Sequence, residues 1–252
     1  MGFDVAADAY DRYMGAWSRL LSPQLVAFAD VRRGHRVLDV GCGPGALTAE
    51  LSGLLGPEAV TAVDPSESFV IAARARHPGV DVRRATAEAL PFSDAAFDVV
   101  LAQLVVHFMT DPVAALNEMR RVTRQGGMVA ACVWDYAGGR GPLGPFWEAA
   151  RGVDPDVVDE SRLAGTREGH LAELFEAAGL GAIEETVLTS SREYASFEAW
   201  WEPFTRGVGP GGAFVARLDA TRRAELRERC RAMLPDGQFV LTAHAWAARG
   251  TV

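Results

Sequence analysis

The stretch VLDVGCGPGALT, residues 37–48, is the part of this chain best suited to bind a ligand through its backbone. Three glycines, Gly41, Gly43 and Gly45, follow a hydrophobic run that contains an acid, Asp39. A strand, a glycine turn and a helix in this order place bare N–H groups at the start of the helix, where a ligand can approach closely. The expected chemistry is the binding of a nucleotide or nucleoside cofactor.

The glycine spacing by itself is compatible with two cofactor classes. Gly41, Gly43 and Ala46 satisfy a loose dinucleotide pattern, and Asp64 lies where a ribose-binding acid is expected. Asp39 separates the classes, because its carboxylate would repel a pyrophosphate in a pocket of low dielectric. S-adenosylmethionine has no phosphate and carries an ammonium and a sulfonium. Its ribose hydroxyls could both donate to the two oxygens of Asp64.

These residues need a sheet to position them, and the chain predicts one. Short apolar runs alternate with helix-like segments between residues 36 and 134, which is typical of βαβ units around a parallel sheet. We expect strands at 36–40, 60–64, 80–84, 97–103 and 128–134, and two more at 182–189 and 239–247.

Four segments of the chain resemble the class I S-adenosylmethionine-dependent methyltransferases, in particular the small-molecule enzymes of the type 11 group. They are VLDVGCGPG, VTAVDPS, ATAEALPFSDAAFDVVLAQLVVHF and EMRRVTRQGGMVAACVWD, in the family's order between residues 36 and 135. The resemblance implies an α/β fold: a Rossmann-like, doubly wound sheet of seven strands whose last strand is antiparallel, with a helical lid insertion.

The resemblance also implies a role for individual side chains. Asp39, Gly41 and Gly43 would face the methionine end of the cofactor, and Asp64 would hold its ribose. The other implied cofactor contacts are Pro65 and Ser66 beside the adenosine, Ala87 and Glu88 along the adenine, and Gln103 beneath the cofactor. The family commonly has an acid where this chain has Thr86, so the contact to the adenine amino group is open.

Two segments interrupt the regular alternation and are expected to form the acceptor side. We expect one methyltransferase domain over 1–252, with a cofactor-binding core at 36–135 and lid excursions at 136–165 and 190–237. Loops above a rigid sheet normally carry specificity. One of the adjacent Trp200 and Trp201 is expected to line an acceptor pocket, although both could instead pack inside the insertion.

Two further residues are candidates beside the cofactor. His107 follows the strand at 97–103, and its ordinary pKa would suit a general base, although a buried structural histidine is the competing interpretation. Tyr10, Tyr13 and Trp17 share one face of a predicted helix. That face is typical of core packing, but in the resembling enzymes this helix often covers the cofactor, so Tyr13 could bind it.

The composition excludes several other classes. The net charge of −8 argues against nucleic acid or an anionic membrane as a partner, and the arginines of RLDATRRAELRERCRAM are interrupted by acids that could pair with them. Three widely spaced cysteines suggest neither a disulfide framework nor a metal site. Without an apolar run of about 18 residues or a signal-like start, the chain is expected to be cytoplasmic. Its oligomeric state is open.

The predicted function is transfer of the methyl group of S-adenosylmethionine to an oxygen, nitrogen or carbon of a small organic acceptor, with S-adenosylhomocysteine as product. The alternative is a nicotinamide-dependent oxidoreductase built on the same glycine turn. A protein that binds the cofactor without turnover is the third possibility.

Overall fold

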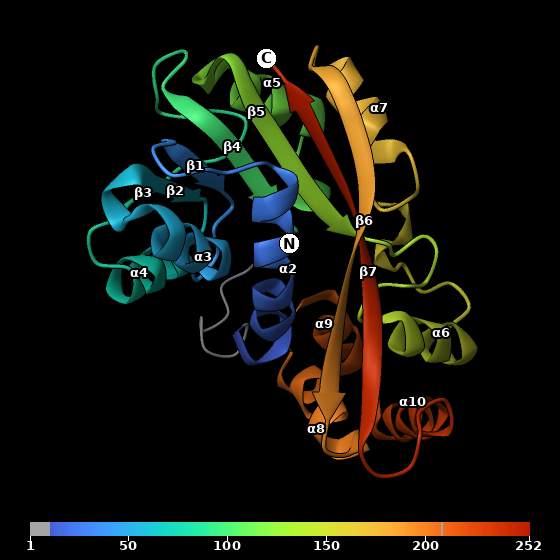
Figure 1. Cartoon of the computed structure of the whole chain (residues 1–252). Helices are drawn as coiled ribbons and strands as arrows, with labels where there is room; N and C mark the ends of the chain where they lie inside the picture. Colours follow the sequence, from blue (N-terminus) through green and yellow to red (C-terminus); the bar gives the residue numbers. More distant parts are fainter. Residues whose placement is uncertain (1–10, 208) are drawn as a thin grey trace.

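One seven-stranded sheet organises the computed structural model, which describes residues 11–207 and 209–252 (Figure 1). The strand order is β3-β2-β1-β4-β5-β7-β6. The strands are β1 (Val37–Val40), β2 (Val60–Asp64), β3 (Asp81–Arg84), β4 (Phe97–Gln103), β5 (Thr123–Trp134), β6 (Gly181–Tyr194) and β7 (Phe239–Thr251). The strands from β1 to β5 pair in parallel, and β7 pairs antiparallel to both β5 and β6. The predicted fold, including the antiparallel last strand, is confirmed.

Alternating side chains of the central strands build two separate cores. Val37, Val99 and Leu101 face one core, together with α2 (Ala16–Phe28) and α3 (Ala46–Leu55). Leu38 and Val100 face the other, under α5 (Pro112–Val122) and α7 (His170–Ala177). The helix α4 (Glu67–Arg76) packs on β2 and β3. Because these strands are covered on both faces, their sequences are mostly apolar.

The order of the strands creates the place where a ligand can bind. The chain moves from β1 outward to β2 and β3 and then returns to the other side of β1 with β4. The loops that leave β1 and β4 therefore diverge at the carboxyl ends of neighbouring strands. Such a switch point is where open α/β sheets bind ligands.

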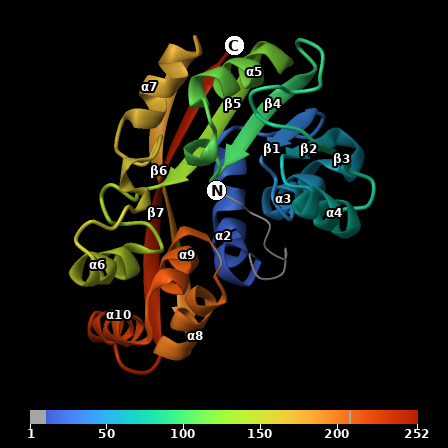
Figure 2. The same cartoon turned by 180° about the vertical axis from the view of Figure 1, so that it is seen from behind.

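The helices of the lid gather around the far ends of β6 and β7 (Figures 1 and 2). They are α6 (Gly144–Val153), α8 (Phe197–Trp201), α9 (Gly209–Arg217) and α10 (Ala220–Ala232). Tyr194, at the end of β6, stacks on Phe239, at the start of β7, with ring centroids 5.5 Å apart. The two strands thus extend beyond the sheet and carry the lid.

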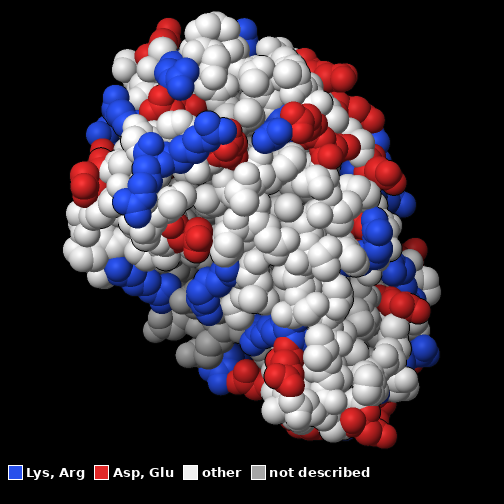
Figure 3. Space-filling model, viewed as in Figure 1, with Lys and Arg blue, Asp and Glu red and all other residues white. Residues whose placement is uncertain are grey.

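Several arginines of α10 pair with acids, and the Arg229 pair has the helical spacing that the sequence predicted. Arg229 bonds Glu225 one turn earlier, and Arg227 and Arg231 both reach Glu198 of α8. Arg231 also lies over the ring of Phe197, 4.3 Å from its centroid. On the face seen in Figure 3, arginines lie beside carboxylates around a broad uncharged area.

Candidate active site

The turn after β1 is shaped by glycines in the left-handed region of the backbone. Gly41, Gly43 and Gly45 have φ of +73°, +54° and +101°. The N–H groups of Gly41 and Cys42 both donate to the carbonyl of Val63 in β2, at 2.8 and 2.9 Å, which fixes the turn against the next strand. A Cβ on Gly41 would come within 2.7 Å of Val105, whereas a Cβ on Gly43 would meet nothing within 4 Å. Open space therefore lies beside Gly43.

That space belongs to a cleft of about 670 Å³ at the carboxyl ends of β1, β2 and β4. Eight of the residues predicted from the sequence line it: Gly41, Gly43, Asp64, Pro65, Ser66, Ala87, Glu88 and His107. Thr86 also lines the cleft, next to Ala87. Among these predicted residues, Gly41 and His107 are 66 positions apart in the chain and line the same cleft.

Asp64 closes β2 with both of its carboxylate oxygens engaged. Oδ2 accepts from the Gly43 N–H at 2.9 Å and Oδ1 accepts from the Ser66 N–H at 2.8 Å. Burial raises the pKa of this carboxyl, and the two backbone donors oppose that shift. A carboxylate oxygen can accept more than one hydrogen bond, so Asp64 retains capacity for a ligand's hydroxyls. Ser66 directly precedes α4, and its hydroxyl bonds Ser68 rather than capping the helix.

Asp39 and Gln103 lie behind the glycine turn rather than in the cleft. Both line a small cavity of about 30 Å³ that shares Gly41 and Gly43 with the cleft. Oδ2 of Asp39 accepts from the Thr48 hydroxyl at 2.6 Å, and Nε2 of Gln103 donates to the carbonyl of Ser18 at 3.1 Å. Among the described residues neither Asp39 Oδ1 nor Gln103 Oε1 has a partner.

Two buried acceptors without donors are what a bound ammonium would satisfy. Burial raises the pKa of Asp39 to about 7, with the negative charge of Asp64 adding to the effect. A cation beside Asp39 would favour its ionised form. The residues present therefore fit the methionine end of the cofactor that the resemblance implies, with its ammonium toward Asp39 and Gln103.

Glu88 has a structural task as well as a place in the cleft. Its Oε1 accepts from the Thr110 N–H at 2.9 Å, just before Asp111 caps α5 by accepting from the Ala114 N–H. Glu88 thus joins the loop after β3 to the start of α5. The contact between Glu88 and an adenine stays a prediction.

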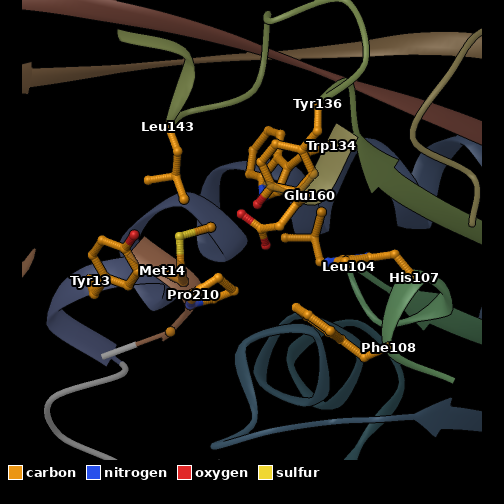
Figure 4. Close-up of a pocket in the computed structure, with 11 residues that line it drawn as sticks. Tyr13, Met14, Leu104, His107, Phe108, Trp134, Tyr136, Leu143, Glu160 and Pro210 are labelled. Carbon is orange, nitrogen blue, oxygen red and sulfur yellow. The ribbon is translucent and has the colours of Figure 1, made fainter. Parts of the chain in front are cut away.

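A second, inner cavity of about 30 Å³ adjoins the cleft (Figure 4). Leu104, His107 and Phe108 line both cavities. Tyr13, predicted to cover the cofactor, lines the inner cavity with Met14 and not the cleft. Trp17 packs in the core, and its Nε1 donates to the Tyr194 hydroxyl at 3.2 Å. Tyr10 lies outside the described residues.

His107 is buried at the boundary of the two cavities. Burial lowers the pKa of its imidazole to about 3, and its Nδ1 has no hydrogen-bond partner among the described residues. The ring is therefore neutral at pH 7. A proton acceptor with so low a pKa is weak, which counts against the general-base hypothesis without testing it.

Glu160 is a residue of this site that sequence reasoning missed. It is 3% exposed and lines the inner cavity from a loop between α6 and α7. Its Oε2 accepts from Trp147 Nε1 at 3.1 Å, and the Tyr136 hydroxyl also bonds it. Burial raises the pKa of Glu160 to about 7. The sequence around Glu160 gives no sign that this acid is buried, because the segments that bury it are distant in the chain.

The lid tryptophans do not line the inner cavity. Trp200 and Trp201 are both buried, within 5.8 Å of the Phe204 ring centroid. Phe204 in turn stacks on Phe146 at 4.3 Å. Neither tryptophan lines the cleft or either small cavity, because both pack against neighbouring aromatic rings, so a place for one of them in an acceptor pocket stays a prediction.

Within 11–207 and 209–252, no group of three or more His, Cys, Asp or Glu side chains is arranged to hold a metal ion. Across the same residues, every helix is too short or too polar to cross a bilayer.

A family model and named relatives indicate that this chain is a methyltransferase. The family model described as "Methyltransferase domain" matches residues 38–131. A malonyl-[acyl-carrier protein] O-methyltransferase of Erwinia billingiae is 39% identical over 127 residues, 50% of this chain and 49% of that protein. An uncharacterized protein of Mycobacterium tuberculosis is 30% identical over 232 residues, 86% of this chain and 82% of that one.

Solved structures share the whole fold. The YcgJ protein of Bacillus subtilis superposes with a TM-score of 0.61 at 21% identity, covering 91% of this chain and 97% of that one. Phosphoethanolamine N-methyltransferase 2 of Haemonchus contortus, solved with S-adenosylhomocysteine, gives a TM-score of 0.60 at 19% identity, covering 100% of this chain and 58% of that one. The chain belongs to the class I methyltransferases and is an enzyme that uses S-adenosylmethionine.

Proposed function

We propose that this enzyme methylates a small organic acceptor held in the inner cavity, while the large cleft holds S-adenosylmethionine. The observation that carries the proposal is the shared boundary: Leu104, His107 and Phe108 line both cavities. A methyl group can pass only between sites that touch, and alignment of the two reactants supplies much of the acceleration of such a displacement. The sulfonium of the bound cofactor supplies the methyl group.

Individual side chains divide the work of binding the cofactor. Asp64 accepts from the ribose hydroxyls, with Pro65 and Ser66 beside the adenosine and Ala87 and Glu88 along the adenine. The bare backbone of Gly41 and Gly43 admits the methionine portion, and Asp39 and Gln103 receive its ammonium. Tyr13 acts on the acceptor side, since it lines the inner cavity.

The walls of the inner cavity are largely apolar. Met14, Leu104, Phe108, Trp134, Leu143 and Pro210 surround the inner cavity. Its volume of about 30 Å³ corresponds to roughly one water molecule, so an organic acceptor enters only when lining side chains shift. Tyr13 and Met14 come from the N-terminal helical segment and Gly209 and Pro210 from α9, so movement of either segment would widen the cavity.

Relatives of known activity act on different atoms. One is named an O-methyltransferase and one structural neighbour an N-methyltransferase. This chain aligns with only about half of the first and 58% of the second, so neither acceptor transfers to it directly. A small-molecule acceptor is the statement that the size and apolar character of the inner cavity support.

The proposal is tested by substitution of the ribose acid. Asp64→Asn should weaken S-adenosylhomocysteine binding by about 1–3 kcal/mol, roughly 5- to 150-fold, because buried hydroxyl donors lose a charged partner. Asp81→Asn is the matched control, since Asp81 lies on the neighbouring strand β3, is exposed and pairs with Arg83 away from the cleft. Calorimetry measures both. Equal affinity in Asp64→Asn and wild type would remove Asp64 from the site.

Turnover is measured separately with methyl-labelled S-adenosylmethionine and a small-molecule extract. Label should appear in low-molecular-weight products that form only with active protein. Binding without any labelled product would contradict the proposed transfer and leave a binding protein. Binding of a nicotinamide cofactor in place of S-adenosylhomocysteine would contradict the cofactor assignment.

A further inference from the structure

We propose that Glu160 is the catalytic base of this enzyme: it binds a hydroxyl group of the acceptor and takes its proton during methyl transfer. This inference rests on the proposed function, because it names the chemical class of acceptor for the same inner cavity. The acceptor is a compact, largely apolar alcohol or phenol.

The position of Glu160 supports this role. Figure 4 shows its carboxylate pointing into the middle of the cavity, among Tyr136, Trp134, Leu104 and Met14. His107, Leu104 and Phe108 form the side of the same cavity that borders the cofactor cleft. A group bound to Glu160 therefore lies in the cavity from which the methyl group is reached.

The carboxylate is held rigidly by its surroundings. Asp159 caps the turn that carries Glu160 by accepting from the Ser161 N–H at 2.9 Å, and Arg151 of α6 pairs with Asp159 at 2.5 Å. The Thr166 hydroxyl donates to the carbonyl of Leu163 at 2.8 Å, at the end of the same turn. A base fixed in this way needs little reorganisation when the proton moves.

Glu160 has two neutral donors but no cationic partner. Trp147 and Tyr136 bond it, and among the described residues no arginine or histidine forms an ion pair with it. A structural buried carboxylate normally has a charged partner. Burial and the negative charge of Asp159 raise the pKa of Glu160 to about 7, and the donors Trp147 and Tyr136 oppose the rise. A pKa near the working pH suits a base.

His107 does not compete for this role. It lines the same cavity, but burial lowers the pKa of its imidazole to about 3, so it holds a transferred proton poorly. When the surroundings of two titratable groups drive their pKa values apart, the difference indicates which group accepts the proton. The neutral His107 ring, with its unpartnered Nδ1 among the described residues, can position the acceptor instead.

The charge in the cavity selects the class of acceptor. Glu160 is the one acidic side chain among the described residues that line it. A carboxylate acceptor would place a second negative charge beside Glu160 without solvent. An ammonium would be attracted by Glu160, but its remaining N–H donors would face largely apolar walls. A neutral hydroxyl needs one acceptor. It loses its proton to Glu160, its oxygen forms the new bond to the methyl carbon, and the pair of the broken carbon–sulfur bond stays on sulfur.

The test combines product analysis with a pH profile. Methyl-labelled S-adenosylmethionine and a small-molecule extract should yield labelled ethers. Glu160→Gln keeps the shape of the side chain and an acceptor for Trp147, so it should bind S-adenosylhomocysteine as wild type does but lower turnover by about 10²- to 10⁴-fold. In wild type, turnover should rise with pH through about 7, where Glu160 ionises, and the variant should lose this rise.

Two neighbouring variants move the profile in opposite directions. Tyr136→Phe removes a donor to the charged form and should shift the midpoint of the profile to higher pH. Asp159→Asn removes a like charge and should shift it to lower pH. A purely structural role for Glu160 would leave the midpoint unchanged in both variants.

The outcomes separate the two proposals. Labelled esters or amines, or full turnover in Glu160→Gln, would overturn the assignment of Glu160 while leaving methyl transfer intact. Binding of S-adenosylhomocysteine with no labelled product of any kind would overturn the proposed transfer, and the assignment with it. Labelled ethers together with the shifted profiles would support both.

Discussion

At the residue scale, the buried acids of this enzyme have different tasks because their surroundings differ. Asp64 receives two backbone N–H groups, Asp39 receives hydrogen bonds from Thr48, and Glu160 receives an indole and a phenol. Each carboxyl retains acceptor capacity toward a cavity. Because none of the three has an arginine partner among the described residues, burial raises all three pKa values.

The raised pKa of Asp39 predicts that cofactor binding releases a proton near neutral pH. Its pKa of about 7 means that the carboxyl is partly protonated near neutral pH, and an ammonium bound beside it would favour ionisation. The affinity for S-adenosylhomocysteine should therefore rise between about pH 6 and pH 8. Calorimetry in buffers of different ionisation enthalpy measures the proton released below pH 7. Asp39→Asn should bind more weakly, and its affinity should no longer change over this range.

The same experiment has a clear contrary result. If Asp39→Asn releases as many protons as wild type does on binding, another group is linked to the cofactor, and Asp39 is only a structural partner of Thr48.

At the element scale, two glycines of the turn between β1 and α3 are predicted to have different roles, Gly41 in folding and Gly43 in cofactor binding. Gly41→Ala combines a φ of +73° with a Cβ 2.7 Å from Val105, so this variant should be strongly destabilised. Gly43→Ala has open space around its Cβ, and its φ of +54° costs only about 1–2 kcal/mol. Gly43→Ala should therefore fold but lose most of its cofactor affinity. Thermal unfolding and calorimetry on both variants distinguish these effects, and wild-type affinity in Gly43→Ala would show that the cofactor does not approach this turn.

The elements were the part of the structure most accessible from sequence. The strand at 97–103 is confirmed to the residue, because its apolar run is clear in the sequence. The helix that follows is marked by Asp111 as its cap and Pro112 in its first turn. The strands at 182–189 and 239–247 are longer than predicted, reaching Gly181–Tyr194 and Phe239–Thr251. The added residues 190–194 of β6 pair with 239–243 of β7, and the added residues 248–251 of β7 pair with both β5 and β6. Local patterns do not record such pairing between distant segments.

At the scale of the whole molecule, the cofactor side was predictable and the acceptor side was not. Gly41 and Gly43 lie in the turn between β1 and α3, and Asp64 ends the next strand, β2, so all three belong to one contiguous βαβ unit, residues 37–64, that the sequence pattern marks. Glu160 and Tyr13 meet across 147 positions of chain, and only the packed lid brings them together. Leu104, with a φ of +60°, shows the same limit, because leucine gives no sign of a left-handed conformation at the boundary of two cavities.

The burial of His107 should make the stability of the folded chain depend on pH. Its pKa is about 3 in the folded state and 6.5 ordinarily, so the unfolded state binds more protons between these values. Lowering the pH from 6.5 toward 4 should destabilise wild type relative to His107→Asn by on the order of 2–3 kcal/mol. Asp39 and Glu160 act in the opposite direction, but both remain in the variant and cancel in the difference. Denaturant unfolding at several pH values measures it, and a constant difference would show that His107 is solvated.

The central claim is that the cleft beside the glycine turn holds S-adenosylmethionine with its ribose on Asp64 and its methyl group toward the inner cavity. A crystal structure of the complex with S-adenosylhomocysteine tests it most directly. We expect both ribose hydroxyls within hydrogen-bond distance of Asp64, the ammonium beside Asp39 and Gln103, and the sulfur facing Leu104 and His107. A ligand whose ribose lies away from Asp64, or whose sulfur faces away from the inner cavity, would contradict this account.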